Sequence, residues 1–152
     1  MKTPERILWP TDFSDLSLKA SPYARGFRDL FKAELHVVHV SPPTVTPSIE
    51  RWLPNRLRVS KAELFEAARS QLEQVVVEHF GGDPTVICKV LMGNPWTAIC
   101  EYAERHDIDL ILLATHGLTG VQHILLGSTA ERVVHHACCP VLTIKCHERD
   151  FK

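Results

Sequence analysis

The sequence predicts a doubly wound α/β fold, in which a five-stranded parallel sheet carries helices on both faces. Two observations and one general rule of chain topology predict it. Apolar runs of strand length alternate along the chain with amphipathic segments of helix length, which is typical of a parallel sheet. The run at 107–115 has a centre too apolar to face water on either side, as a central parallel strand requires. Right-handed crossovers then leave a doubly wound sheet as the expected arrangement.

The strands are recognised by short apolar runs that end at loop-forming residues. The first run, RILWP, leads into Thr-Asp, and the second, ELHVVHV, ends at Ser-Pro-Pro. Residues 41–59 contain four prolines among polar residues and predict a long loop. The expected strands span 6–10, 34–40, 85–91, 107–115 and 141–145.

The first two helices are predicted by apolar residues at helical spacing and by their capping residues. The first begins at Ser14 or Asp15, and Pro22 inside it predicts a bend or an irregular first half. The second is long and begins at Ser60, which is expected to form a capping box with Glu63. A Gly-Gly pair after it predicts where this helix ends.

The starts of the last two helices are also predicted by residues in or next to their first turns. The third follows Asn94, a favourable N-cap residue, and has Pro95 at its first position. The fourth spans 128–136, and a second capping box is expected between Ser128 and Glu131.

Length and composition indicate one globular domain, spanning 1–152, that is able to bury a hydrophobic core. The hydrophobic fraction is 45%, the charged fraction is 23% and the formal net charge is −1. We therefore expect no general affinity for nucleic acid or for an anionic membrane. No signal peptide or membrane-spanning run is recognised, and the expected location is the cytoplasm.

The five cysteines are odd in number, contain no CxxC pair and lack the spacing of a disulfide scaffold. Cys138 and Cys139 are the unusual feature, because a bridge between adjacent residues is strained. We interpret them as reduced thiols at a helix end, with a metal or redox role as the alternative.

Ligands of doubly wound sheets bind beyond the carboxyl ends of the strands, at the point where strand order reverses. After the fourth strand the chain reads ATHGLTG, and GST opens the last helix. Gly117 and Gly127 allow tight turning and close approach to a ligand, while Ser128 and Thr129 supply hydroxyl and N–H groups at a helix N-terminus. These residues predict an anion-binding loop without a Walker lysine or a GxGxxG motif, and the alternative is turn glycines before an ordinary helix cap.

Three stretches of the chain resemble the universal stress protein family, in the same order and over essentially the whole length. They are ILWPTDFSD at 7–15, ELHVVHV at 34–40, and ATHGLTGVQHILLGSTAERVV at 114–134 followed by CPVLTIK at 139–145. The resemblance implies a Rossmann-like sheet of strand order 3-2-1-4-5 and an ATP-binding stress-response protein. The family's nucleotide motif is G-x-x-G, nine residues, then G-[ST]; here it begins with Ala114 and Gly117 and ends with Gly127 and Ser128.

The resemblance also implies which residues bind ATP. Asp12 would bond the ribose or adenine region, Val40 would meet the adenine with its backbone groups, and Leu113 would line the path of the ribose and phosphates. Mg²⁺ or Mn²⁺ would be held through the phosphates rather than by the protein. The implied ATP-binding set is Pro10, Asp12, Val40, Leu113, Ala114, Gly117, Gly127, Ser128 and Thr129.

Ala114 departs from the motif, because ATP-binding members have glycine at this position. An added methyl group would crowd the ligand or require a φ angle that alanine disfavours. The first hypothesis is a nucleotide-dependent sensor, without catalytic residues and with slow hydrolysis at most, because the usual groups for phosphoryl transfer are missing. The alternative is an interaction module of the same fold that does not bind nucleotide. A flavodoxin-like redox domain is disfavoured, because the loop suits neither flavin nor CxxC exchange.

The last strand is expected at an edge of the sheet, where unpaired backbone groups invite pairing with another copy. The resemblance implies dimerisation through this strand, and we predict a two-fold homodimer that acts on a protein partner of unknown identity. The interface residues are Val141, Leu142, Thr143 and Ile144.

Nine histidines are many for this length. His36 and His39 are expected to be core or sheet-face residues, and His116 and His123 flank the phosphate loop. No metal site made by the protein is expected, because no helix carries a His pair at i, i+4 with a third ligand nearby.

Overall fold

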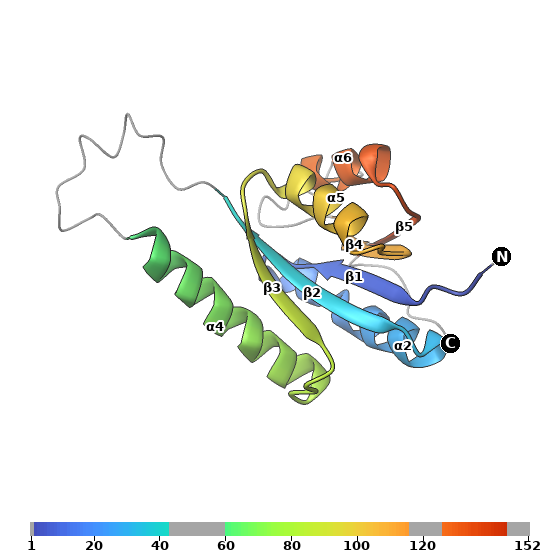
Figure 1. The fold of residues 1–152 in the computed structure, drawn as a ribbon, viewed down its shortest axis with the longest axis horizontal. Helices are drawn as coiled ribbons and strands as arrows, with labels where there is room; N and C mark the ends of the chain where they lie inside the picture. Colours follow the sequence, from blue (N-terminus) through green and yellow to red (C-terminus); the bar gives the residue numbers. More distant parts are fainter. Residues whose placement is uncertain (1, 43–59, 116–125, 146–152) are drawn as a thin grey trace.

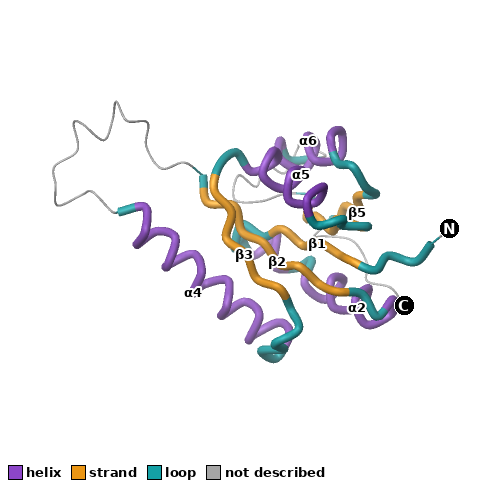
Figure 2. The backbone as a smooth tube through the Cα atoms, in the orientation of Figure 1, coloured by secondary structure: helices purple, strands orange, loops and turns teal. Residues whose placement is uncertain are grey.

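The computed structural model describes residues 2–42, 60–115 and 126–145. Five strands form one parallel sheet of order β3-β2-β1-β4-β5, which confirms the predicted fold class and strand order (Figures 1 and 2). The elements in chain order are β1 (Arg6–Pro10), α1 (Asp15–Leu18), α2 (Ser21–Phe31), β2 (Glu34–Ser41), α4 (Lys61–Phe80), β3 (Ile87–Met92), α5 (Pro95–Arg105), β4 (Leu110–Ala114), α6 (Ser128–His136) and β5 (Val141–Ile144).

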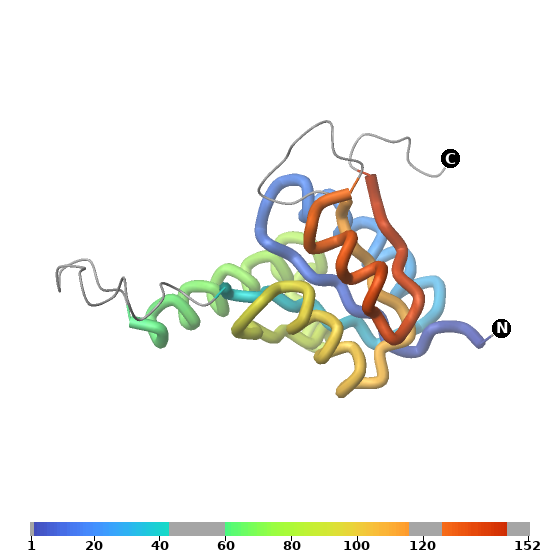
Figure 3. The backbone as a smooth tube through the Cα atoms, turned by 90° about the horizontal axis from the view of Figure 1, so that it is seen from above, coloured from blue at the N-terminus to red at the C-terminus, as the bar shows by residue number. Residues whose placement is uncertain are grey.

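Helices cover both faces of the sheet. α2 and α4 pack on one face against β1, β2 and β3, whereas α5 and α6 pack on the other (Figure 1). Seen from above, α5 and α6 lie side by side (Figure 3). β1 pairs with β2 on one side and with β4 on the other, so strand order reverses beside β1. The carboxyl ends of β1 and β4 therefore form the switch point at which ligands of such sheets bind.

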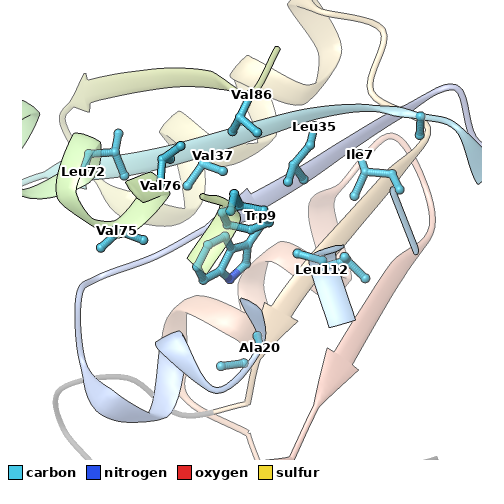
Figure 4. Packing of buried hydrophobic residues seen from close by; sticks show 14 of the residues in the cluster. Ile7, Trp9, Ala20, Leu35, Val37, Leu72, Val75, Val76, Val86 and Leu112 are labelled. Atoms are coloured by element: carbon cyan, nitrogen blue, oxygen red, sulfur yellow. The ribbon is translucent and has the colours of Figure 1, made fainter. Parts of the chain in front are cut away.

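Alternate residues of β1 enter two hydrophobic cores, one on each face of the sheet. Ile7 and Trp9 belong to the core under α2 and α4, and Leu8 belongs to the core under α5 and α6. All three side chains are fully buried. Figure 4 shows the Trp9 side chain among the buried side chains of its core. The Trp9 ring centroid lies 5.7 Å from that of Phe80. Burial of each such side chain contributes about 1.5–3 kcal/mol, so packing on both faces holds β1 in place.

The predicted start and end of the long helix α4 are confirmed. The Ser60 hydroxyl accepts from the Glu63 N–H at 3.1 Å, and the Glu63 carboxylate accepts from the Ser60 N–H at 2.8 Å. The helix ends at Gly81, whose φ of 66° lies in the left-handed region that glycine adopts without strain. Neither α4 nor any other helix of the described chain is both long and apolar enough to cross a membrane.

The other helix starts give one confirmation and one correction. Pro22 lies in the first turn of α2, separated from the short helix α1, as the expected irregular first half requires. The second capping box is wrong, because Gly127 is the N-cap residue and Ser128 is already the first helical residue. The helix itself spans Ser128–His136 as predicted. The Gly127 N–H donates to the Thr115 carbonyl at 2.7 Å, so a tertiary contact holds the N-cap residue.

Strand β4 begins at Leu110, three residues later than predicted. Asp107 has a φ of 48° and belongs to the turn after α5. The Asp109 carboxylate accepts from the N–H groups of Glu5 and Arg6, both at 2.9 Å. The side chains of Asp107 and Asp109 both contact the start of β1, since Asp107 also pairs with Arg6 at 3.6 Å. The two residues therefore belong to the connection between α5 and β4, and β4 begins after them.

Strand β3 begins at Ile87 instead of residue 85. The Asp83 carboxylate accepts from the N–H of Thr85 at 2.9 Å and from its hydroxyl at 2.7 Å, which keeps this segment in a turn. Asp83 also pairs with Arg28 of α2. The Arg28 guanidinium, together with Thr85, lowers the pKa of Asp83 to about 2.

Candidate functional site

A cavity of about 290 Å³ opens at the switch point of the sheet. The carboxyl ends of β1, β2 and β4 line it, together with the first turns of α5 and α6. Most of the lining is apolar, and Asp12 is the only Asp, Glu, Lys or Arg among the described lining residues. Such a cavity, apolar with a few convergent polar groups, has the character of a small-molecule site.

The structure brings most of the predicted site residues together in this cavity. Gly117 lies outside the described residues, as do His116, His123 and residues 43–59 of the predicted loop. The predicted residues that line the cavity are Pro10, Asp12, Val40, Leu113, Ala114, Gly127, Ser128 and Thr129.

The cavity is also lined by residues outside the set predicted from the sequence. Thr11 directly follows β1, and Thr115 directly follows β4. Because ligands of such sheets bind beyond the carboxyl ends of the strands, both residues were predictable from the sequence. His39 was expected in the core or on a sheet face, and its contact with the cavity depends on the neighbouring loop. The additional lining residues are Thr11, Ser17, His39, Pro42, Pro95, Ile99, Thr115 and Ala130.

Asp12 is held by the loop between β1 and α1. Its Oδ1 accepts from the Ser14 N–H at 3.0 Å and from the Ser14 hydroxyl at 2.5 Å. The same Ser14 hydroxyl accepts from the Ser17 N–H at 3.1 Å and so caps α1. The carboxylate therefore has a defined orientation before any ligand binds.

A second set of contacts fixes the residues on either side of Asp12. The buried Thr11 hydroxyl lies 2.9 Å from the Ser17 hydroxyl and accepts from the Phe13 N–H at 3.1 Å. Phe13 has a φ of 65°, a left-handed conformation that an aromatic residue rarely adopts. The contacts around Phe13 must therefore offset backbone strain at this point of the loop.

The opposite side of the cavity is the N-terminus of α6. Gly127, the N-cap residue, has an extended conformation with φ −67° and ψ 153°. Ser128 and Thr129 follow in the first turn, where backbone N–H groups lack helical acceptors and the helix dipole favours an anion. Thr115 joins this turn to the sheet, because its carbonyl accepts from Gly127 and its N–H donates to the Ile144 carbonyl at 3.0 Å.

Ala114 fits its position without backbone strain. Its φ is not positive, since the described non-glycine residues with positive φ are Phe13, Lys32 and Asp107. Ala114 is 8% exposed and belongs to the core under α2 and α4, although it also borders the cavity. The expected φ conflict is therefore absent, and the methyl group packs within the core.

His39 combines a hydrogen bond with partial burial. Its Nδ1 lies 2.9 Å from the Thr11 carbonyl oxygen, and its ring stacks on that of Phe13. Burial lowers the pKa of His39, although the bond to Thr11 and the nearby Asp12 charge act in the opposite direction. The neutral ring is therefore favoured at pH 7, with the proton on Nδ1 because a carbonyl oxygen only accepts.

The other histidine of β2, His36, is a core residue. His36 is buried, with Nδ1 2.8 Å from the Tyr102 hydroxyl and Nε2 2.9 Å from the Glu34 carboxylate. The described cysteines form no disulfide, and burial raises the pKa of Cys139 to about 12. Within the described residues, no group of three or more His, Cys, Asp or Glu side chains is arranged to hold a metal ion.

A doubly wound sheet with a ligand-sized cavity at its switch point defines the structural class of this protein. The family model described as the universal stress protein family matches residues 4–145. The chain belongs to the universal stress protein family.

Its relatives support this assignment in sequence and in structure. It is 36% identical to universal stress protein MJ0531 of Methanocaldococcus jannaschii, over 93% of this chain and 82% of that protein. The structure of MJ0577 from the same organism is 30% identical, has a TM-score of 0.80 and is matched over 97% of this chain and 100% of its own. A universal stress protein in complex with cAMP has a TM-score of 0.72 over 95% of this chain and 99% of its own; at 18% identity it is similar in fold alone.

Proposed function

We propose that this chain is a cytoplasmic ATP-binding regulator of the stress response, which acts as a nucleotide-dependent homodimeric sensor. The observation that carries the proposal is a cavity with Asp12 on one side and the N-terminus of α6 on the other. A nucleotide uses both, because its ribose hydroxyls need acceptors and its phosphates need N–H donors.

The size and lining of the cavity suit an adenine nucleotide. A volume of about 290 Å³ is near the lower end of the usual range for small-molecule sites, about 300–1,000 Å³. Val40, Ile99 and Leu113 offer apolar contacts to a base. The fold itself is compatible with such a ligand, since the universal stress protein solved with cAMP shares it.

The charge of the phosphates requires a counterion. The described lining contains no lysine or arginine, and the α6 dipole supplies only partial positive charge. Mg²⁺ or Mn²⁺ bound through the phosphates would balance the remainder, without ligands from the protein.

A regulator fits this lining better than a fast enzyme. Phosphoryl transfer needs positive groups and a residue that orients the nucleophile, and the described lining supplies no lysine or arginine. Slow hydrolysis would leave the nucleotide bound long enough to influence a partner. Thr115 offers a route, because it joins the start of α6 to β5, the strand proposed for dimerisation.

The test of this function is the nucleotide content of the purified protein, measured by heat release and chromatography. Calorimetric titration with ATP and Mg²⁺ follows, with GTP as the comparison. We expect co-purified adenine nucleotide, or a Kd of about 1 μM, equivalent to about 8 kcal/mol of binding free energy. Absence of bound nucleotide and of titration heat would instead favour the interaction module that does not bind nucleotide.

Replacement of Ala114 by glycine tests whether the departure from the family motif matters. Because the methyl group packs in the core, Ala114→Gly is expected to lower the free energy of unfolding by about 0.5–1 kcal/mol. ATP affinity should change by less than about 3-fold. Urea unfolding and calorimetry measure the two effects, and a tenfold or greater gain in affinity would show that the methyl group obstructs the ligand.

The proposed dimer uses the outer edge of β5. Within the described residues, β5 pairs with β4 alone. The carbonyls of Pro140 and Ile144 point toward β4, where they accept from Ile111 and Thr115, both at 3.0 Å. Because backbone direction alternates along a strand, the N–H and C=O groups of Val141 and Thr143 point toward the outer edge.

Thr143→Pro is expected to convert the dimer to a monomer. Proline removes an outward N–H donor while the bonds between β5 and β4 remain, whereas proline at Leu142 would break that pairing. Sedimentation and light scattering measure the mass, and Thr143→Val, which keeps the N–H, should remain dimeric. An unchanged dimer mass for the folded Thr143→Pro variant would rule out this interface.

A further inference from the structure

The side chain of His39 belongs to β2 but contacts the loop that follows β1. Its Nδ1 donates to the Thr11 carbonyl oxygen over 2.9 Å. Its ring stacks on the Phe13 ring, with centroids 4.1 Å apart and planes inclined by 22°. These contacts hold the residues immediately before and after Asp12.

The loop needs such contacts because its backbone is strained. Phe13 has a φ of 65°, which a non-glycine residue adopts when its surroundings stabilise it. The Phe13 N–H donates to the Thr11 hydroxyl, and the Ser14 N–H donates to Asp12 Oδ1. Both of these hydrogen bonds require the strained loop conformation, and His39 stabilises that conformation from outside the loop.

We propose that His39 is a positioning residue of the nucleotide site, which holds Thr11 and Phe13 and thereby orients Asp12 at the cavity. The inference rests on the proposed function for the identity of the ligand. The orientation of the loop by His39 does not depend on a ligand and is expected in the nucleotide-free protein as well.

The hydrogen bond to the Thr11 carbonyl needs an uncharged donor at the position of Nδ1. In His39→Asn, the side-chain amide nitrogen takes the approximate place of Nδ1 and can donate to Thr11. In His39→Gln, the amide nitrogen reaches the position of Nε2 instead and misses that carbonyl. The two variants are alike in polarity and differ in where the donor lies, so their comparison isolates the positioning contact.

A matched control is available at the amino ends of the central strands, where His106 lies beside Arg6 and His36. His106 Nδ1 also lies 2.9 Å from a backbone carbonyl, that of Tyr102, and the His106 ring also stacks on an aromatic ring, at 3.9 Å from Tyr102. His106→Gln therefore removes the same kind of contacts away from the cavity. It measures the general cost of losing a stacked histidine.

The experiment measures hydrogen exchange of the Phe13 and Ser14 amides by NMR in nucleotide-free protein, and ATP affinity by calorimetry. His39→Gln should speed exchange at these amides by about 10-fold and weaken ATP binding by about 10-fold. His39→Asn keeps the bond to Thr11 and loses only the stack on Phe13, so both changes should be smaller, about 3-fold, and His106→Gln should leave both unchanged.

Two results separate this inference from the proposed function. Equal exchange rates at Phe13 and Ser14 in His39→Gln, His39→Asn and the original protein would overturn the positioning role. Faster exchange in His39→Gln than in His39→Asn, in a protein that binds no ATP, would support positioning of Asp12 while the proposed function fails.

Discussion

The Gly127→Val variant is expected to lose ATP affinity by about 100-fold while retaining its fold. Gly127 lines the cavity at the N-cap of α6, so a branched side chain there would occupy space needed by the phosphates. Its extended backbone is accessible to valine, and the poorer N-cap should lower the free energy of unfolding by about 1 kcal/mol. Calorimetry with ATP and Mg²⁺ measures the affinity, and urea unfolding measures the stability.

The control for this variant adds the same atoms in open space. Gly26 lies within α2, and a Cβ built there meets no atom within 4 Å. Gly26→Val should bind ATP as the original protein does. Retention of full affinity by Gly127→Val would mean that the phosphates do not approach the start of α6.

The Asp12→Asn variant is expected to weaken ATP binding by about 10-fold, because a charged acceptor becomes a neutral one. Asparagine keeps an oxygen that can accept from Ser14, so the loop should retain its conformation. If the carboxylate bonds the ribose, 2′-deoxy-ATP should bind about 10-fold more weakly than ATP to the original protein and about equally to the variant.

Asp15 supplies the matched control for Asp12. It is exposed in the first turn of α1, three residues farther along the chain, and does not line the cavity. Asp15→Asn should leave affinity unchanged. A gain in affinity on Asp12→Asn would place the carboxylate near the phosphates, where its removal relieves repulsion, and would contradict a contact with the ribose.

Most of the fold was predictable because its signals are local. The apolar runs of β1 and β2, the capping box at Ser60 and the glycine at 81 act over a few residues, and each is found where it was expected. The late start of β3 comes from the local turn between Asp83 and Thr85. The other errors occurred where distant segments meet. Asp109 bonds the start of β1, and Gly127 bonds the end of β4, and neither contact leaves a local pattern.

In the candidate site, too, some features follow from local sequence and others from tertiary contacts. The sequence alone determined the parallel doubly wound class, the strand ends at which a ligand is expected, and the glycine and hydroxyl residues at the start of the last helix. It could do so because strand alternation, helix caps and turns depend on neighbouring residues. These local rules selected Gly127, Ser128 and Thr129, whereas Pro10, Asp12, Val40, Leu113 and Ala114 were implied by the resemblance to the universal stress protein family.

Only the tertiary structure decided how those residues meet. It brought His39 of β2 against the loop after β1, placed the Ala114 methyl group in a core, and joined α6 to β5 through Thr115. The physical reason is that these contacts arise from strand order and register, which bring together residues far apart in the chain. Side-chain direction at such contacts depends on packing across the whole sheet, and no local pattern encodes it.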